Sequence, residues 1–306
     1  MSVARPPRTP ACNRASEDHS TVRQALVQAG LAPIDAQVLL AHVLGTDRAW
    51  LVAHATDPLA RRDAEAFFTL ARRRRDGEPV AYLTGEREFW GLSLAVDRSV
   101  LIPRPETETL VECALRSLPS DRPVRVLDIG TGSGAIAVAI ARERPQAQVL
   151  ATDVSAAALV VATRNAARMK LGNVRLLQSN WYERLSGGES VFDLIVSNPP
   201  YVADADPHLA EGDVRFEPVT ALRGGRDGLA ALHVVIAGAP AWLAPGGGLI
   251  VEHGYDQADA VRALMRAAVL ADAGVFRDLA GIARVSAATK AVAPRRIPLT
   301  PLQSES

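Results

Sequence analysis

The stretch that decides the fold of this 306-residue chain is Val124-Arg-Val-Leu-Asp-Ile-Gly-Thr-Gly-Ser-Gly-Ala-Ile136. Its first six residues have the apolar character of a buried strand, and an apolar helix pattern begins after the last glycine. Glycines between a strand and a helix let the backbone turn tightly and approach a ligand beside the positive end of the helix. The stretch therefore predicts a strand, loop and helix that together bind a nucleoside cofactor.

Strand and helix patterns alternate along the chain beyond this loop. We expect strands at 124–129, 149–152, 174–177, 191–196 and 249–252, and helices at 133–144 and 155–170. Such alternation is typical of a parallel sheet that is covered on both faces by helices. The predicted fold class is α/β, with a doubly wound, mostly parallel, Rossmann-like sheet and a small N-terminal helical domain.

The helical domain is predicted because apolar residues recur at helical spacing from Ser20 to about Asp76. After it, the alternating residues at 92–96 predict one strand of a hairpin, which residues 97–99 would turn into a second strand at 100–102. The predicted organisation begins with a disordered N-terminus (1–18), a helical domain for substrate recognition (19–76) and a hairpin linker (77–105). The sheet domain (106–290) and a disordered tail (291–306) follow.

Composition excludes several classes of protein. Lys plus Arg and Asp plus Glu both number 34, so the chain lacks the basic surplus of a protein that coats nucleic acid. Two cysteines without a CxxC motif support neither a disulfide framework nor a metal site. The sequence has no signal-peptide pattern and no apolar run of ~18 residues. We expect a cytoplasmic protein without a metal and without a membrane span.

A carboxylate follows the glycine loop at the end of the next predicted strand. Asp153 follows the glycine loop at the ~20-residue spacing that is typical of dinucleotide sites, and its carboxylate can accept both hydroxyls of a ribose. The glycines alone leave NAD open, because residues 130–135 also fit G-x-G-x-x-A, and they leave open a structural turn without a ligand. Asp128 favours a cationic ligand over a pyrophosphate, and the spacing Gly130-x-Gly132-x-Gly134 is that of methyltransferases that use S-adenosyl-L-methionine.

A second motif, Ser197-Asn-Pro-Pro-Tyr201, follows the predicted strand at 191–196. The prolines stiffen the loop, so that the Asn198 side chain and nearby carbonyls face outward from the strand's carboxyl end. An NH₂ group on a carbonyl or aromatic ring is a poor nucleophile because its lone pair is delocalised. If Asn198 Oδ1 and the Pro199 carbonyl each accept one N–H, the lone pair is held towards a methyl donor, and Tyr201 can stack on the planar group. Asn-Pro is also an ordinary turn signal.

On these motifs the chain resembles amino-group methyltransferases with an Asn-Pro-Pro-Tyr motif, and among them the HemK/PrmC family. That family methylates the side-chain amide nitrogen (N5) of the glutamine in the Gly-Gly-Gln motif of peptide-chain release factors. The resemblance extends from about Ser20 to Ala288. Beyond the two motifs and Asp153, it rests on stretches at 77–85, 88–91, 102–108, 179–181, 217–218, 225–228 and 252–254.

The resemblance implies roles for individual residues. The methionine part of S-adenosyl-L-methionine would be lined by Gly130, Thr131, Gly132, Ser133 and Gly134. Asp153 would hold the ribose and Trp181 would lie against the adenine. The substrate glutamine would be bound by Asn198, Pro199, Pro200 and Tyr201, with Asn198 and Pro199 catalytic and Asn198 also near the cofactor. Asn180 stands where relatives commonly have Asp, so no carboxylate contact to the adenine is implied there.

Three alternatives stay open. A sister branch methylates a glutamine of a ribosomal protein, and the Pro-Glu-Thr-Glu segment at 105–108 favours the release-factor branch over it. A nucleic-acid adenine N6-methyltransferase could use the same acceptors, but it would need a basic surface. The third is a non-catalytic adaptor that binds the cofactor, which the intact motif disfavours. The predicted partners are release factors, with no DNA, no membrane and a monomeric chain.

His253 and an arginine run each have a functional and an ordinary structural explanation. His253 follows Glu252 at the end of a predicted strand, and we expect it to pack or to support a neighbour rather than to act as a base. The run Arg72 to Arg75 would either contact the partner protein or form the solvated face of a helix.

Overall fold

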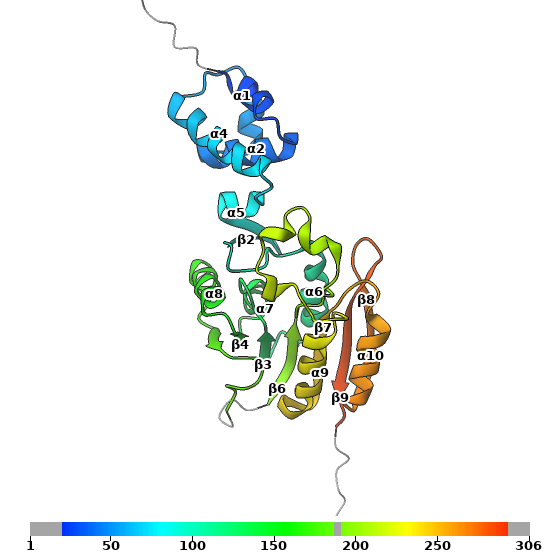
Figure 1. Ribbon diagram of the computed structural model, residues 1–306. Coiled ribbons are helices and arrows are strands. Elements are labelled where there is room, and N and C mark those ends of the chain that lie inside the picture. Colours follow the sequence, from blue (N-terminus) through cyan, green and yellow to red (C-terminus); the bar gives the residue numbers. More distant parts are fainter. Residues whose placement is uncertain (1–19, 187–190, 293–306) are drawn as a thin grey trace, which may run out of the picture. The chain divides into compact units, whose positions relative to one another are not determined.

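The structure is a computed structural model that describes residues 20–186 and 191–292 (Figure 1). The chain divides into two compact units between Thr84 and Gly85, and each unit is described by itself. The disordered ends predicted at 1–18 and 291–306 lie outside the described residues, except for Ala291 and Val292.

The first unit is helical. It consists of α1 (Val22–Gln28), α2 (Pro33–Leu44), α3 (Arg48–Ala53), α4 (Arg61–Arg75) and α5 (Val80–Thr84). Thr21 begins α1 with a capping box to Gln24, and Gly45 ends α2 in the left-handed conformation. Buried side chains such as Leu39 and Phe67 form a core of the unit's own. The small helical domain of the predicted fold class is confirmed, and the unit continues through α5, past residue 76.

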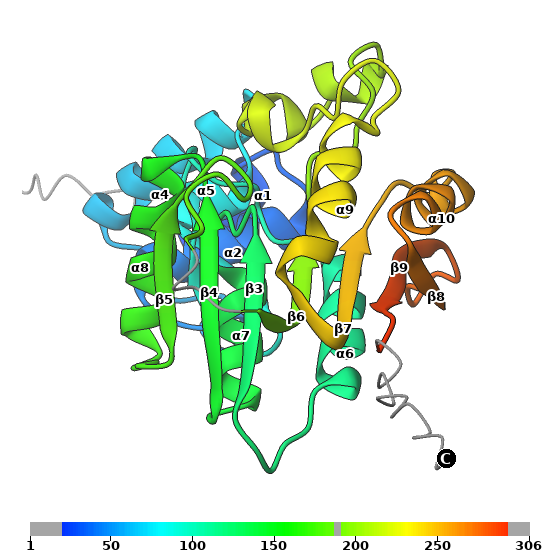
Figure 2. The same cartoon turned by 90° about the horizontal axis from the view of Figure 1, so that it is seen from below.

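The second unit contains a seven-stranded sheet in the order β5-β4-β3-β6-β7-β9-β8 (Figure 2). The strands are β3 (Val124–Ile129), β4 (Ala147–Asp153), β5 (Val174–Gln178), β6 (Phe192–Ser197), β7 (Leu243–Glu252), β8 (Leu270–Arg277) and β9 (Ala283–Lys290). The first five strands in the order are parallel, and β9 is antiparallel to both of its neighbours. A doubly wound, mostly parallel sheet is therefore confirmed.

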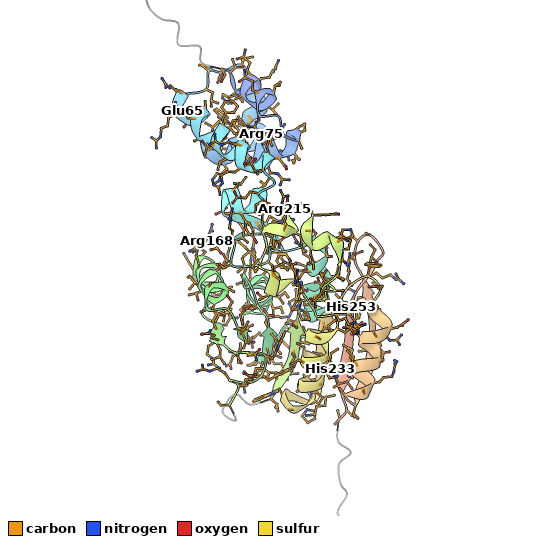
Figure 3. All side chains as sticks on the ribbon, viewed as in Figure 1. Glu65, Arg75, Arg168, Arg215, His233 and His253 are labelled. Atoms are coloured by element: carbon orange, nitrogen blue, oxygen red, sulfur yellow. The ribbon has the colours of Figure 1, made fainter. Side chains whose placement is uncertain are left out.

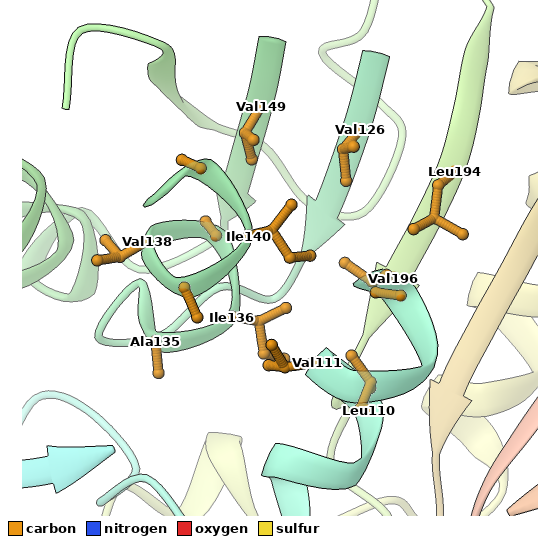
Figure 4. Close-up of a cluster of buried hydrophobic side chains, with 14 of the residues drawn as sticks. Leu110, Val111, Val126, Ala135, Ile136, Val138, Ile140, Val149, Leu194 and Val196 are labelled. Atoms are coloured by element: carbon orange, nitrogen blue, oxygen red, sulfur yellow. The ribbon is translucent and has the colours of Figure 1, made fainter. Parts of the chain in front are cut away.

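Helices cover both faces of this sheet, and alternate residues of each strand supply the two cores. The two sets are α6 (Glu108–Ser117), α7 (Ala135–Glu143) and α8 (Ala156–Arg168) on one face, and α9 (Ala230–Trp242) and α10 (Ala258–Ala267) on the other. On the first face, Ile140 of α7 points towards Val126 and Val149, and Ile136 lies beside Val111 of α6 (Figure 4). Short 3₁₀ helices at 105–107, 207–210, 214–216 and 219–221 lie in the connections.

The hairpin of the predicted linker has a different register from the one expected. Its strands are β1 (Glu86–Phe89) and β2 (Leu92–Ala95), and the second strand expected at 100–102 is wrong. Trp90 and Gly91 both have positive φ, as a two-residue hairpin turn requires. Ile102 instead donates its N–H to the Glu217 side chain. The hairpin belongs to the second unit, because Phe89 and Leu92 enter the core beside α6 and α7.

The strand order reverses between β3 and β6, and this reversal positions the site. Successive strands after β3 are added on one side, through β4 and β5, whereas β6 and β7 are added on the other. Ile129 pairs with Ser197 in the register, and Ser197 Oγ donates to the Ile129 carbonyl over 2.7 Å. The glycine loop and the Asn-Pro-Pro-Tyr loop thus leave adjacent strands at the same height, where open α/β sheets bind ligands.

Within residues 20–186 and 191–292, every helix is too short or too polar to cross a bilayer.

Candidate functional site

A cavity of about 320 Å³ opens where β3, β4 and β6 end. Its volume lies within the ~300–1,000 Å³ of pockets that hold small-molecule ligands. The lining includes most of the predicted cofactor residues, namely Gly130, Thr131, Gly132, Ser133, Asp153, Trp181 and Asn198, together with Pro200. The strand reversal therefore brings together residues from three separate parts of the chain.

The glycine loop is held by its own backbone. The N–H groups of Gly130 and Thr131 both donate to the Thr152 carbonyl over 2.9 Å. The space that a Cβ would take at Gly130 and Gly132 is open, so the backbone itself faces the cavity there. Gly134 differs, because a Cβ at that position would lie 3.1 Å from the Ala162 Cβ. Gly134, predicted to line the cofactor site, instead lets α7 pack closely against α8.

The Asp153 carboxylate is fixed by two backbone donors. Its Oδ2 accepts the Gly132 N–H and its Oδ1 accepts the Ser155 N–H, each over 2.8 Å. Burial raises the pKa of this carboxyl, and the backbone hydrogen bonds act in the opposite direction. Each oxygen keeps a second lone pair, so Asp153 can accept further hydrogen bonds from hydroxyls in the cavity.

Asp128 lies beneath the loop rather than in the cavity wall. It is completely buried, and its Oδ2 accepts a hydrogen bond from the Thr131 hydroxyl over 2.6 Å. Burial raises the pKa of Asp128 to about 7. Thr131 lines the cavity and Asp128 does not, so the carboxylate whose charge favoured a cationic ligand in the sequence lies behind Thr131 and without direct contact to the cavity.

Replacing Asp128 with Asn tests whether burial raises the pKa of this carboxyl in the folded protein. The folded pKa of about 7 lies above the unfolded value of ~3.9, so the folded protein binds the proton more tightly and wild-type stability falls as pH rises from about 4 to 7. Asn does not titrate. We expect the stability of Asp128→Asn relative to wild type to increase over that window, by up to ~4 kcal/mol. Urea unfolding of both proteins at several pH values measures this, and a difference that stays constant with pH would contradict it.

A second cavity of about 190 Å³ adjoins the first. Pro199 and Tyr201 line it, whereas Pro200 lines the first cavity. Asn198 lines both. Successive residues of the motif therefore line alternate cavities, and Asn198 lies at the boundary between the two.

The amide of Asn198 has a defined orientation. Its Nδ2 donates to Thr107 Oγ1 over 3.1 Å. Within residues 20–186 and 191–292, neither Asn198 Oδ1 nor the Pro199 carbonyl oxygen accepts a hydrogen bond. Two neighbouring acceptors are thus left for a ligand, as the sequence argument requires.

The Tyr201 side chain is fixed by a hydrogen bond to a buried carboxylate. Its hydroxyl donates to Glu252 Oε1 over 3.0 Å, and burial raises the pKa of the phenol. Thr107 and Glu252 occur in stretches that carry the family resemblance, but the sequence assigned neither a role. The structure places both in contact with the motif.

The backbone of the motif is held by a second glycine cluster that the sequence argument left without a function. A Cβ at Gly224 would lie 2.7 Å from the Pro200 carbonyl oxygen, and one at Gly228 would lie 2.3 Å from that of Tyr201. Gln257 Nε2 also donates to the Tyr201 carbonyl over 3.0 Å. The signal available in the sequence was the density of glycines at 224–228.

Two further segments complete the wall of the first cavity. Arg104 forms an ion pair with Glu217, which is 4% exposed and also accepts the Ile102 N–H. Trp181 lines the cavity in a left-handed conformation, with φ 49°, and its carbonyl accepts the Ser179 hydroxyl. Asn180 also lines the cavity, while its Nδ2 donates to Glu183 over 2.6 Å.

His253 is engaged in packing (Figure 3). It is fully buried, its Nδ1 lies 2.9 Å from the Gly254 carbonyl and its Nε2 lies 2.9 Å from Ser286 Oγ. Because the carbonyl can only accept, Nδ1 carries the proton and Nε2 accepts from the serine. Burial lowers the pKa of this imidazole. Both ring nitrogens are therefore used within the fold, as expected for a supporting residue.

The arginine run on α4 also makes contacts within its own unit. Arg73 pairs with Glu78, Arg74 pairs with Asp35, and Arg75 donates to the Ala29 carbonyl over 2.7 Å. These contacts hold the C-terminal part of α4 against neighbouring segments, so the run does more than form a solvated face.

Comparisons with known proteins agree with the division of the chain into two units. Residues 20–85 match the PrmC N-terminal domain, and residues 107–213 match the methyltransferase small domain. A release factor glutamine methyltransferase of Xylella fastidiosa is 56% identical over 253 residues, which cover 83% of this chain and 91% of that protein. One of Bordetella pertussis is 54% identical over 265 residues, covering 87% and 97%. A methyltransferase structure from Pyrococcus furiosus, 22% identical, covers 72% of this chain and 98% of that chain with a TM-score of 0.50.

Proposed function

Because this chain belongs to the family of release factor glutamine methyltransferases, we propose that it methylates the glutamine side chain of the Gly-Gly-Gln motif in peptide-chain release factors. The methyl group comes from S-adenosyl-L-methionine and is transferred to the amide nitrogen, N5. The observation that carries the proposal is the pair of unpaired acceptors, Asn198 Oδ1 and the Pro199 carbonyl, at the boundary of two adjoining cavities.

The first cavity fits the cofactor. Gly130 and Gly132 present open backbone to it, Asp153 can accept the ribose hydroxyls, and Trp181 offers a flat wall for the adenine. When bound, S-adenosyl-L-methionine supplies an electrophilic methyl group on a sulfonium. Gly134 and Asp128 support the loop from behind and take no direct part in binding.

The second cavity receives the substrate amide. Asn198 Oδ1 and the Pro199 carbonyl each accept one N–H of the glutamine NH₂ group, which fixes the direction of the nitrogen lone pair. Well-oriented groups gain roughly 7–11 kcal/mol of the barrier from positioning alone. Tyr201 packs against the planar amide, and burial of the site keeps water away from the reacting atoms. The amide proton leaves to solvent after the transfer, so no general base is required.

The helical unit is proposed to recognise the release factor. Residues 20–85 carry the family's N-terminal domain, and this unit has a core separate from that of the sheet. The proposal includes no DNA or membrane partner, a monomeric chain and a place in the cytoplasm. Equal numbers of acidic and basic residues disfavour the adenine methyltransferase alternative.

The test is transfer of labelled methyl groups to defined substrates. The protein is incubated with labelled S-adenosyl-L-methionine and, separately, a release factor, the same factor with Glu in place of the motif glutamine, a ribosomal protein and DNA. We expect label on the unaltered release factor and none on the variant. Label on DNA alone, or on the ribosomal protein alone, would overturn the proposed substrate.

A further inference from the structure

One asparagine of α8, Asn165, is completely buried. Asparagine is a poorer helix former than alanine or leucine, and an amide that is buried without hydrogen bonds is costly. Both N–H groups of this side chain are used, because Nδ2 donates to the Ala95 carbonyl over 3.0 Å and to the Ser133 carbonyl over 2.8 Å. Oδ1 accepts the Ala95 N–H over 2.7 Å. The amide therefore bridges two segments that are distant in sequence.

The orientation of this amide follows from its partners. The Ala95 N–H can only donate, so it requires Oδ1, whereas the Ala95 and Ser133 carbonyls can only accept, so they require Nδ2. A half-turn of the amide would bring two donors or two acceptors together at all three contacts. Because an amide does not titrate, the bridge has a single arrangement at every pH at which the protein is folded.

One end of the bridge is the glycine loop. Ser133 lines the first cavity, is 3% exposed and lies between Gly132 and Gly134, whose φ angles are 56° and 82°. Glycines give a loop backbone many alternative conformations. Gly132 is held through its N–H by Asp153, and the bond from Asn165 holds the carbonyl of the next residue. The bridge thus fixes the part of the loop that leads into α7.

The other end of the bridge is Ala95, the last residue of β2. The chain continues from there into residues 98–101, all four of which line the first cavity. Just beyond them, the Ile102 N–H donates to Glu217 over 3.0 Å. This cavity-lining segment is therefore anchored at both ends by buried polar side chains, by Asn165 before it and by Glu217 after it.

We propose that Asn165 is a positioning residue for S-adenosyl-L-methionine, whose amide holds the glycine loop and residues 98–101 at the separation that the cofactor needs. Asn165 does not line the cavity, so it acts through Ser133 and Ala95. The inference rests on the proposed function, because that function assigns the first cavity to this cofactor. Affinity for the cofactor, rather than the methyl transfer step, is the quantity that depends on Asn165.

Loss of the bridge lowers the fraction of molecules whose cavity can bind the cofactor. The apparent Kd rises by the inverse of that fraction, so a competent fraction of about one tenth gives a Kd about tenfold higher. Bound cofactor stabilises the competent arrangement, and at saturating cofactor the transfer step proceeds as in wild type. The expected signature is a higher Kd and a higher KM for S-adenosyl-L-methionine at nearly unchanged kcat.

The experiment compares Asn165→Ala and Asn165→Asp with the same substitutions of Asn173. Alanine removes all three hydrogen bonds and improves the helix propensity of α8, whereas aspartate keeps the size and the acceptor but replaces Nδ2 with an oxygen. Asn173 is the matched control because its Nδ2 also donates to backbone carbonyls, which belong to residues outside the cavity lining. These are the carbonyls of Ala141, Arg144 and Ala147.

Calorimetry gives the Kd for S-adenosyl-L-methionine without any release factor, and urea unfolding gives the stability. We expect both substitutions of Asn165 to raise the Kd by at least about tenfold and both substitutions of Asn173 to leave it within about twofold, although all four variants lose stability. For a variant that is partly unfolded, the increase in its unfolding midpoint on addition of the cofactor reports the same affinity. A purely structural role would lower the active fraction, and hence kcat, at both positions and would leave KM unchanged.

The outcomes are distinct from those of the functional test. If wild type does not bind S-adenosyl-L-methionine, the proposed function fails. If wild type binds it and the Asn165 variants bind it equally tightly, or the Asn173 variants lose as much affinity, the positioning role is overturned. A kcat for release factor methylation that falls with stability while KM for the cofactor stays at the wild-type value would also overturn it.

Discussion

Asn198→Ala is expected to lower kcat for release factor methylation by about 10²- to 10³-fold, while the Kd for S-adenosyl-L-methionine changes by less than about threefold. The substitution removes the side-chain acceptor at the boundary of the two cavities and leaves the Pro199 carbonyl alone. The substrate nitrogen can then rotate about its remaining hydrogen bond, and much of the positioning effect is lost. The Nδ2–H bond to Thr107 is lost too.

Asn180→Ala is the matched control for this variant. Asn180 also lines the first cavity, but its amide is bonded to Glu183 and it does not line the second cavity. The same chemical truncation there should leave kcat close to wild type. Single-turnover rates at saturating release factor, with calorimetry for the cofactor, separate the two effects. Equal rates for Asn198→Ala and wild type would remove the acceptor pair from the mechanism.

The main elements of the candidate site could be predicted because they are local in sequence. An apolar strand followed by glycines, and another followed by Asn-Pro-Pro-Tyr, each place a loop at a strand's carboxyl end. Parallel strands bring those ends to one edge, so the meeting of Gly130 and Asn198 follows from the α/β alternation. The register of Ile129 with Ser197 shows the outcome.

The supporting residues could not be predicted because their contacts are long-range. Thr107 and Asn198 are 91 positions apart, and Tyr201 and Glu252 are 51 apart. A threonine between two glutamates and a glutamate at a strand end have many possible roles until the fold brings each of them to the motif. The sequence also left open where the Asp128 side chain points: its position before the loop is clear, whereas the direction of its side chain, beneath Thr131, depends on the strand's pleat.

The strands beyond residue 268 lacked a usable pattern. β8 is largely exposed at its start, with Ala271, Asp272 and Ala273 all accessible, and Gly274 interrupts it at φ 128°. β9 contains consecutive buried residues from Val285 to Ala288, so it does not alternate between apolar and polar. Neither segment shows the period of a half-buried strand, and pairing with β7 determines both.

Gly228→Ala is expected to reduce kcat by at least about 100-fold although residue 228 contacts neither cavity. The added Cβ would lie 2.3 Å from the Tyr201 carbonyl oxygen, and backbone cannot rotate away as a side chain can. The φ of 76° adds roughly 1–2 kcal/mol of backbone strain for a residue with a Cβ. The loop must shift, which moves Tyr201 and the nearby Pro199 relative to the first cavity.

Gly281→Ala is the control that separates the effect of backbone strain from the effect of displacing the Asn-Pro-Pro-Tyr loop. Its φ of 78° matches that of Gly228, but nothing lies within 4 Å of the position its Cβ would take. Both variants should lose stability in urea unfolding because of backbone strain, and Gly228→Ala should lose more because its Cβ also meets the Tyr201 carbonyl, whereas only Gly228→Ala should lose turnover. A Gly228→Ala protein that unfolds earlier yet methylates the release factor as fast as Gly281→Ala would show that the loop tolerates displacement. The positions of the Asn198 and Pro199 oxygens would then not set the rate.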